Sequence, residues 1–174
     1  MRWRSHNRPV PQADASADGL DEGVWKMMCA ILVAANQGDS AAFIDASERL
    51  TQSLALEGQR LAGTYLLYLL QYRVIEILGH RPTREDLQRL ADRATPKYAR
   101  LLKVEASQLE DTLRTTFKFA SPETELKGGR FAVSSSAALG VLLDNPLADL
   151  QGMRPHLAEW WRRNAEKFRD IGVG

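Results

Sequence analysis

The chain has 174 residues, a mass of 19.5 kDa and a formal net charge of +1 at pH 7. This length suits one domain with enough apolar surface for a core. Because the net charge is close to zero, the charge of the chain as a whole gives no reason to expect binding to nucleic acid, membranes or acidic substrates. Cys29 is the only cysteine, which excludes an intramolecular disulfide and a cysteine-based metal cluster.

The first 19 residues are predicted to form a flexible tail, and residues 20–174 a single helical domain. The tail combines basic and aromatic residues at its start with Pro9 and Pro11, and it has no apolar period. It lacks the apolar run of a signal peptide, so the cytoplasm is the expected compartment. The alternative is an arm that docks on a partner or on nucleic acid.

Residues 20–37 repeat apolar side chains at helical spacing and predict the first helix. Gly38 is expected to close it, and Asp39 to cap a second helix that begins SAAFIDASERL. Whether this second helix breaks before Leu56 stays open at this stage.

The most apolar run, LAGTYLLYLLQYRVIEIL over residues 61–78, predicts a buried helix at about 56–79 around which the bundle is organised. A membrane span needs about 20 uninterrupted apolar residues. Arg60, Gln71, Arg73 and Glu76 interrupt the run, so this interpretation is rejected and no membrane partner is expected.

One stripe of this helix is polar, because its members recur at steps of three or four residues: Glu57, Arg60, Thr64, Tyr68 and Gln71. A solvent-facing seam, or groups bonded to a neighbouring helix, is the favoured interpretation. The alternative is a ligand pocket lined by Arg60, Thr64, Tyr68 and Gln71.

Further helices are predicted after Thr83, which resembles an N-cap followed by acids, and after Thr95-Pro96, which is expected to start a new helix. Others are expected over 104–119, 131–143 and 154–169, with a flexible loop at 127–130. The fold class is therefore all-α, a single-domain bundle of six to eight helices.

The segment 81–103 concentrates basic residues. A solvated helical face is favoured, because Pro96 is expected to interrupt the stripe. The alternative is a nucleic-acid-binding regulator that contacts phosphates through Arg84, Arg89, Arg93, Lys97 and Arg100.

Trp160, Arg162 and Arg163 are the candidate partner-binding residues, because aromatic and arginine side chains are enriched at interfaces. Adjacent tryptophans cannot both face one core, so Trp160 is expected at an edge and Trp161 inside. A protein partner or a homo-oligomer follows from this hypothesis, and simple capping of the bundle is the competing one.

No catalytic or metal-binding motif stands out. The three histidines have no ligand partner at helical spacing, and Ser134–Ser136 lack the G-x-S-x-G context of a hydrolase. No cofactor, metal or catalytic residue is predicted. The favoured function is that of a cytoplasmic, non-enzymatic helical interaction or regulatory protein. The alternatives are the nucleic-acid-binding regulator and the small-ligand-binding protein.

Overall fold

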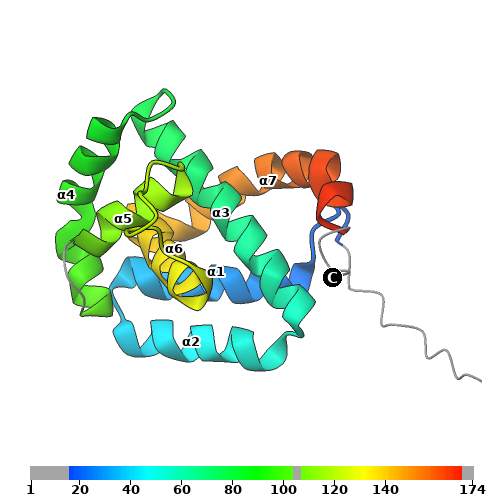
Figure 1. Cartoon of the computed structure of the whole chain (residues 1–174). Helices are drawn as coiled ribbons and strands as arrows, with labels where there is room; N and C mark the ends of the chain where they lie inside the picture. The colour runs from blue at the N-terminus through cyan, green and yellow to red at the C-terminus, as the bar shows by residue number, and fades with distance from the viewer. Residues whose placement is uncertain (1–15, 104–106, 170–174) are drawn as a thin grey trace, which may run out of the picture.

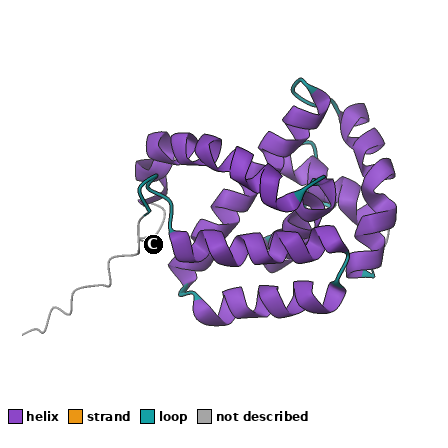
Figure 2. Cartoon of the chain, turned by 180° about the vertical axis from the view of Figure 1, so that it is seen from behind, coloured by secondary structure: helices purple, strands orange, loops and turns teal. Residues whose placement is uncertain are grey.

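The protein is described by a computed structural model that covers residues 16–103 and 107–169. This part of the chain contains seven helices and no strand, which confirms the all-α fold class (Figures 1 and 2). The helices are α1 Glu22–Gln37, α2 Ser40–Ser53, α3 Leu56–Leu78, α4 Arg84–Leu102, α5 Ser107–Thr116, α6 Gly128–Leu142 and α7 Pro146–Arg169. The predicted tail lies mostly outside the described residues, which begin at Ser16.

Local capping chemistry sets the ends of the first helices where the sequence predicts them. The Asp39 carboxylate accepts a hydrogen bond from the Ala42 amide at 2.9 Å, and Gly38 takes the left-handed conformation at φ 71°. Thr83 and Asp86 form a reciprocal capping box at the start of α4. The open question of a break before Leu56 is answered by an extended backbone at Leu54, the C-cap residue that follows α2.

The helical segment enclosed on all sides is the second part of α6, and this differs from the expectation for α3. Residues 134–142 of α6 are all buried, and α6 contacts α1, α3, α4 and α5 (Figure 1). Helix α3 forms close to the predicted bounds but buries one side, leaving Ile75 and Ile77 about 40% and 39% exposed. Small side chains let neighbours approach α6 closely; a Cβ added to Gly140 would lie 3.1 Å from the Leu32 carbonyl oxygen.

Three predicted boundaries are wrong. Helix α4 runs through Pro96 as one helix, so the expected pair of short helices is absent. Helical spacing of the buried side chains continues across the proline, at Leu90, Ala94, Tyr98 and Leu101. The packing of these side chains outweighs the loss of the backbone hydrogen bond that Pro96, which has no N–H, cannot donate. The other two errors are at 127–130, where α6 already begins at Gly128, and at the last helix, which starts at Pro146 rather than at residue 154.

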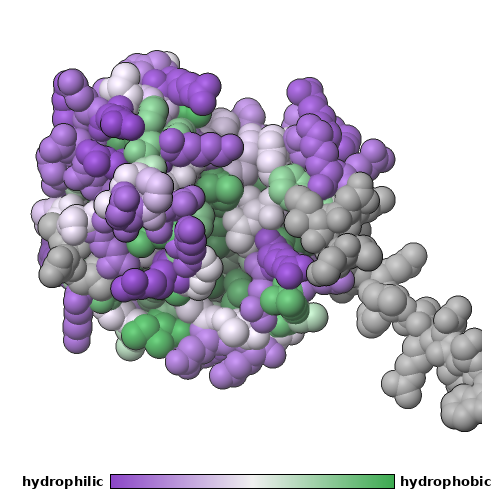
Figure 3. Space-filling model, in the orientation of Figure 1, coloured by the Kyte–Doolittle hydropathy of each residue, from purple (hydrophilic) through white to green (hydrophobic). Residues whose placement is uncertain are grey.

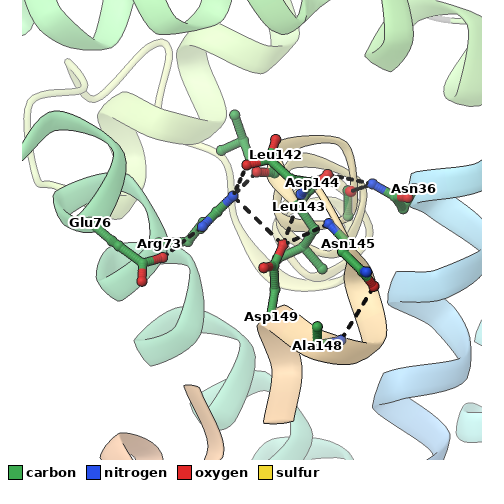
Figure 4. A network of polar contacts seen from close by, with 10 residues as sticks. Asn36, Arg73, Glu76, Leu142, Leu143, Asp144, Asn145, Ala148 and Asp149 are labelled. Atoms are coloured by element: carbon green, nitrogen blue, oxygen red, sulfur yellow. Dashed lines mark hydrogen bonds and ion pairs between the residues drawn. The ribbon is translucent and has the colours of Figure 1, made fainter. Parts of the chain in front are cut away.

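Arg73 joins α3 to the junction between α6 and α7 (Figure 4). Its guanidinium is buried and donates to the Leu142 carbonyl at 3.0 Å and to carboxylates of Glu76 and Asp144 at 2.7 and 3.0 Å. Asp149 lies 3.7 Å from the same guanidinium and accepts from the Asp144 amide at 2.8 Å. The network therefore fixes how α6 turns into α7.

Arg154 performs a similar role for the start of the described chain. It binds Asp18 and Glu22 at 2.7 Å each and lies over the Trp25 ring at 5.1 Å. These bonds hold the pKa of the Asp18 carboxyl well below its usual range. Residues 18–25 are thereby attached to α7.

Candidate functional site: a groove between α3, α6 and α7

An apolar groove of about 790 Å³ lies between the first half of α3, the start of α6 and the second half of α7. The face drawn in Figure 3 carries apolar surface in a hollow between hydrophilic side chains. The lining comprises Glu57, Arg60, Leu61, Gly63, Thr64, Leu66, Leu67, Gly128, Phe131, Ala132, Ser135, Trp161, Ala165 and Phe168. Its volume falls within the usual range of small-molecule sites.

Contacts between α3 and α7 establish how the groove is oriented. The His156 ring stacks on Tyr72 and the Trp160 ring on Tyr68, each at a centroid distance of 4.8 Å, so α7 runs antiparallel to α3. Phe168, late in α7, is therefore at the end of the groove where α3 begins. This end is exposed and includes Glu57.

The opposite end of the groove is buried. Arg73 of α3 donates to the carbonyl of Leu142 in α6, and seven residues before each of them lie Leu66 and Ser135. Both of these groove residues are buried, at 5% and 3% exposure. Trp161, whose ring meets Tyr65 edge-on at 5.6 Å, adds a third wall. The groove thus deepens from a charged mouth to an apolar interior.

Ser135 brings an unusual polar atom to this interior. Its buried hydroxyl has no hydrogen-bond partner within the described ranges 16–103 and 107–169. The neighbouring Ser136 donates to the Ala132 carbonyl at 2.8 Å, and the Ser134 hydroxyl accepts from Gln108 at 3.0 Å. Ser135 is therefore the member of the serine run whose hydroxyl is buried without a partner among the described residues.

The predicted pocket stripe is divided between two roles. Arg60 and Thr64 line the groove, and Arg60 is exposed. Tyr68 instead donates to the His156 carbonyl at 3.1 Å, and burial raises the pKa of its phenol. Gln71 donates to the Thr116 carbonyl of α5 at 3.0 Å. The second half of the stripe therefore joins helices rather than lining a pocket.

The candidate partner residues lie on α7 beside the same aromatic cluster. Trp160 is half-buried, with Tyr68 on one side and Phe168 at a centroid distance of 5.7 Å. Arg162 and Arg163 are exposed and both pair with Glu159, Arg162 at 2.9 Å. Trp161 is also half-buried, so neither tryptophan is fully inside.

The basic candidates of α4 are all exposed. Arg89, Arg93, Lys97 and Arg100 follow one another at steps of four, four and three residues, which places them on one face of the continuous helix. Arg84 is separate and lies over the Phe119 ring at 5.8 Å. Arg89 pairs with Glu85 at 3.2 Å.

Sequence reasoning missed the contribution of α6 to this site. The serine run was considered only for hydrolysis, and the segment at Gly128 only as a turn. The one available signal was the run of three serines, all buried, in an otherwise apolar helix.

Cys29 is a partly buried thiol, and desolvation raises its pKa to about 11.

Two further properties of the described residues bear on the kind of site. They contain no group of three or more His, Cys, Asp or Glu side chains that could hold a metal ion. No single helix among them is long and apolar enough to cross a membrane, whereas α6 and α7 pass that length-and-composition test as a pair bent by 114°.

No protein family, curated protein or solved structure matches the chain. The groove and the charged surface of α4 are therefore the features from which a function is inferred.

Proposed function

We propose that the protein binds a small, mainly apolar molecule in the groove between α3, α6 and α7. The observation that carries this proposal is the groove itself, about 790 Å³ in volume with a mainly apolar lining and few polar groups. Such a combination is typical of ligand sites. Trp161 and Phe168 supply aromatic surface, and Arg60 and Thr64 supply polar groups toward the mouth.

A regulatory role is compatible with this site. A ligand in the groove contacts three helices that are far apart in sequence, so it stabilises their packing by mass action. Helix α7 depends most on such support, because its second half packs on α3 largely through the aromatic contacts described above. Ligand occupancy would then change the order of α7 and of any surface that it presents.

The test is the binding of Nile red, a neutral apolar dye that fluoresces on leaving water. Ala132 lies on the groove wall and is exposed, so Ala132→Trp fills the groove without entering the core. We expect this variant to weaken dye binding at least tenfold. Ala41→Trp, at an exposed position of α2 away from the groove, is the matched control and should bind like the wild type. Equal binding by all three proteins would refute the groove as the site.

A second candidate function has its own observation. The uninterrupted α4 helix places Arg89, Arg93, Lys97 and Arg100 on one exposed face, which removes the objection that Pro96 splits the basic stripe. We propose this face as a sequence-independent contact for the phosphates of duplex DNA. No exposed large apolar side chain of the described residues belongs to α4, which favours a polyanion over a membrane.

Salt dependence tests this second proposal. Four phosphate contacts predict that log K falls with log salt at a slope of about −3.6. Changing Arg93 and Lys97 to glutamine should reduce the steepness by about 2. Changing Arg162 and Arg163 to glutamine removes equal charge from α7 and should leave the slope unchanged. Absence of binding at low salt, or equal slopes in all proteins, would refute the contact.

A further inference from the structure

The groove between α3, α6 and α7 has a charged, exposed mouth and an apolar interior. Resting on the proposed function of this groove, we propose that its ligand is a single-chain amphiphile with an anionic head group, of which a fatty-acid carboxylate is the simplest member. The alkyl chain lies in the interior, and the head group lies at the mouth beside the guanidinium of Arg60.

The interior offers no counter-ion to a charged ligand group. Its walls include Leu66, Leu67 and Trp161, and Leu66 is only 5% exposed. The ionisable side chains of the lining are Glu57 and Arg60, and both are exposed. A charge placed at the buried end would lose its water without gaining a partner, which strongly opposes binding. An ionised head group therefore stays at the mouth, and the part of the ligand inside is apolar.

The length of the groove suits an alkyl chain. Its α3 wall extends from Glu57 to Leu67. At a rise of about 1.5 Å per residue, this part of the helix spans about 15 Å. In a zigzag chain with C–C bonds of about 1.5 Å, each carbon advances the chain by about 1.25 Å, so roughly twelve carbons match the wall.

Arg60 is a charge at the mouth without a partner. Arg49 and Arg89 each pair with an acid four residues earlier. Arg60 has Glu57 three residues earlier, yet it forms no ion pair within the described ranges 16–103 and 107–169. The Thr64 hydroxyl already donates to the Arg60 carbonyl at 3.0 Å. The guanidinium therefore supplies the donors for a head group, and its planar fork suits a carboxylate.

The opposite charge of Glu57 is compensated by its own helix. Glu57 lies in the first turn of α3, where the positive end of the helix dipole stabilises a carboxylate. Helix α6 begins at the groove with Gly128, has no side-chain cap and carries no acid in its first turn, so its positive end adds to the field of Arg60. The mouth thus presents positive charge that an anionic head group complements.

Head-group selectivity is measured with decanoate, decan-1-ol and decyltrimethylammonium, which share one alkyl chain. Binding to the whole chain is followed by calorimetry, below the micelle-forming concentration of each probe. We expect decanoate to bind about threefold to fivefold more tightly than decan-1-ol, as for an ion pair that stays partly in water. Decyltrimethylammonium should bind most weakly. Ala132→Trp, which fills the groove, should weaken the binding of decanoate and decan-1-ol alike.

Two charge variants test the position of the head group. Arg60→Gln should remove the preference for decanoate and leave the affinity for decan-1-ol unchanged. Glu57→Gln should strengthen decanoate binding by about twofold, because it removes an opposing charge. Arg81→Gln is the matched control, since it removes the same charge from an exposed position beyond the other end of α3, and it should keep the preference.

Chain length tests whether the alkyl chain lies inside. From octanoate to dodecanoate, each added methylene should raise the affinity about fourfold, and the gain should level off with tetradecanoate. Equal affinities of decanoate and decan-1-ol, a preference that persists in Arg60→Gln, or an affinity independent of chain length would each overturn the proposed amphiphile. If no alkyl probe binds while Nile red does, the ligand class is wrong and the groove stands. If Nile red fails to bind as well, the groove function itself is refuted.

Discussion

Gly140 offers the sharpest test of how the bundle is packed. A Cβ added here would overlap the Ala35 methyl and lie 3.1 Å from the Leu32 carbonyl oxygen and 3.3 Å from the Asn36 amide nitrogen. Two of these neighbours are backbone atoms of α1, so they cannot turn aside. Overpacking of this kind costs up to about 3 kcal/mol. The better helix propensity of alanine returns about 0.5–1 kcal/mol. We therefore expect Gly140→Ala to lower the free energy of unfolding by about 2 kcal/mol.

A double-mutant cycle separates this overlap from other effects. Ala35→Gly alone should cost about 1–2 kcal/mol through lost helix propensity and lost burial of a methyl group. In the double variant the overlap between the two methyl groups is gone. The added Cβ then makes only close contacts, with the Leu32 carbonyl oxygen and the Asn36 amide nitrogen. The double variant should therefore be more stable than the sum of the single changes predicts, by about 1–2 kcal/mol.

Urea denaturation followed by circular dichroism measures all four proteins of the cycle. Gly152→Ala is the matched control, since nothing lies within 4 Å of the added Cβ in α7; it should gain about 0.5–1 kcal/mol. Additive effects in the cycle, or a Gly140→Ala variant as stable as the control, would show that α1 and α6 do not approach as closely as described.

Arg73→Met should lower the free energy of unfolding by about 2–4 kcal/mol in urea denaturation, since it removes a buried guanidinium that bonds to a carbonyl and to carboxylates; a loss below about 1 kcal/mol would contradict this role. Asp18→Asn should be less stable than the wild type at neutral pH, because its partner Arg154 lowers the pKa of the folded carboxyl below the unfolded value of about 3.9. The difference is full above about pH 4 and shrinks as the pH falls through the folded pKa, so a pH-independent difference would count against the ion pair. Trp161→Ala and Trp160→Ala should both lower thermal stability, because both rings pack on tyrosines of α3. Trp160→Ala should in addition weaken self-association in sedimentation experiments, as the partner-binding hypothesis for Trp160 requires. A wild type that stays monomeric at every concentration would remove the dimer hypothesis.

Helix ends were predictable because their causes are local. Asp39 and Thr83 each cap a helix through the amide three residues later, and Gly38 and Gly79 end helices in a conformation that other residues disfavour. The sequence therefore determined the all-α class, and most of the helix boundaries, from short-range hydrogen bonding and backbone sterics.

Pro96 shows where local rules gave the wrong answer. A proline following threonine favours a helix start, yet α4 continues because its buried residues before and after the proline pack on the same core. That energy comes from neighbours in other helices and is absent from the local pattern. The same holds for the enclosed position of α6, whose small residues acquire meaning only against Leu32 and Ala35 of α1.

The candidate site was decided by tertiary structure alone. Its walls come from residues 57–67, 128–135 and 161–168, and no periodicity relates segments so distant in the chain. Arg60 and Thr64 were found as a stripe because helical spacing put them on one face. Ser135 was not, since an unpaired hydroxyl is defined by the surroundings that fail to bond it. Short-range chemistry fixes the helices, and only their packing determines which surfaces stay uncovered.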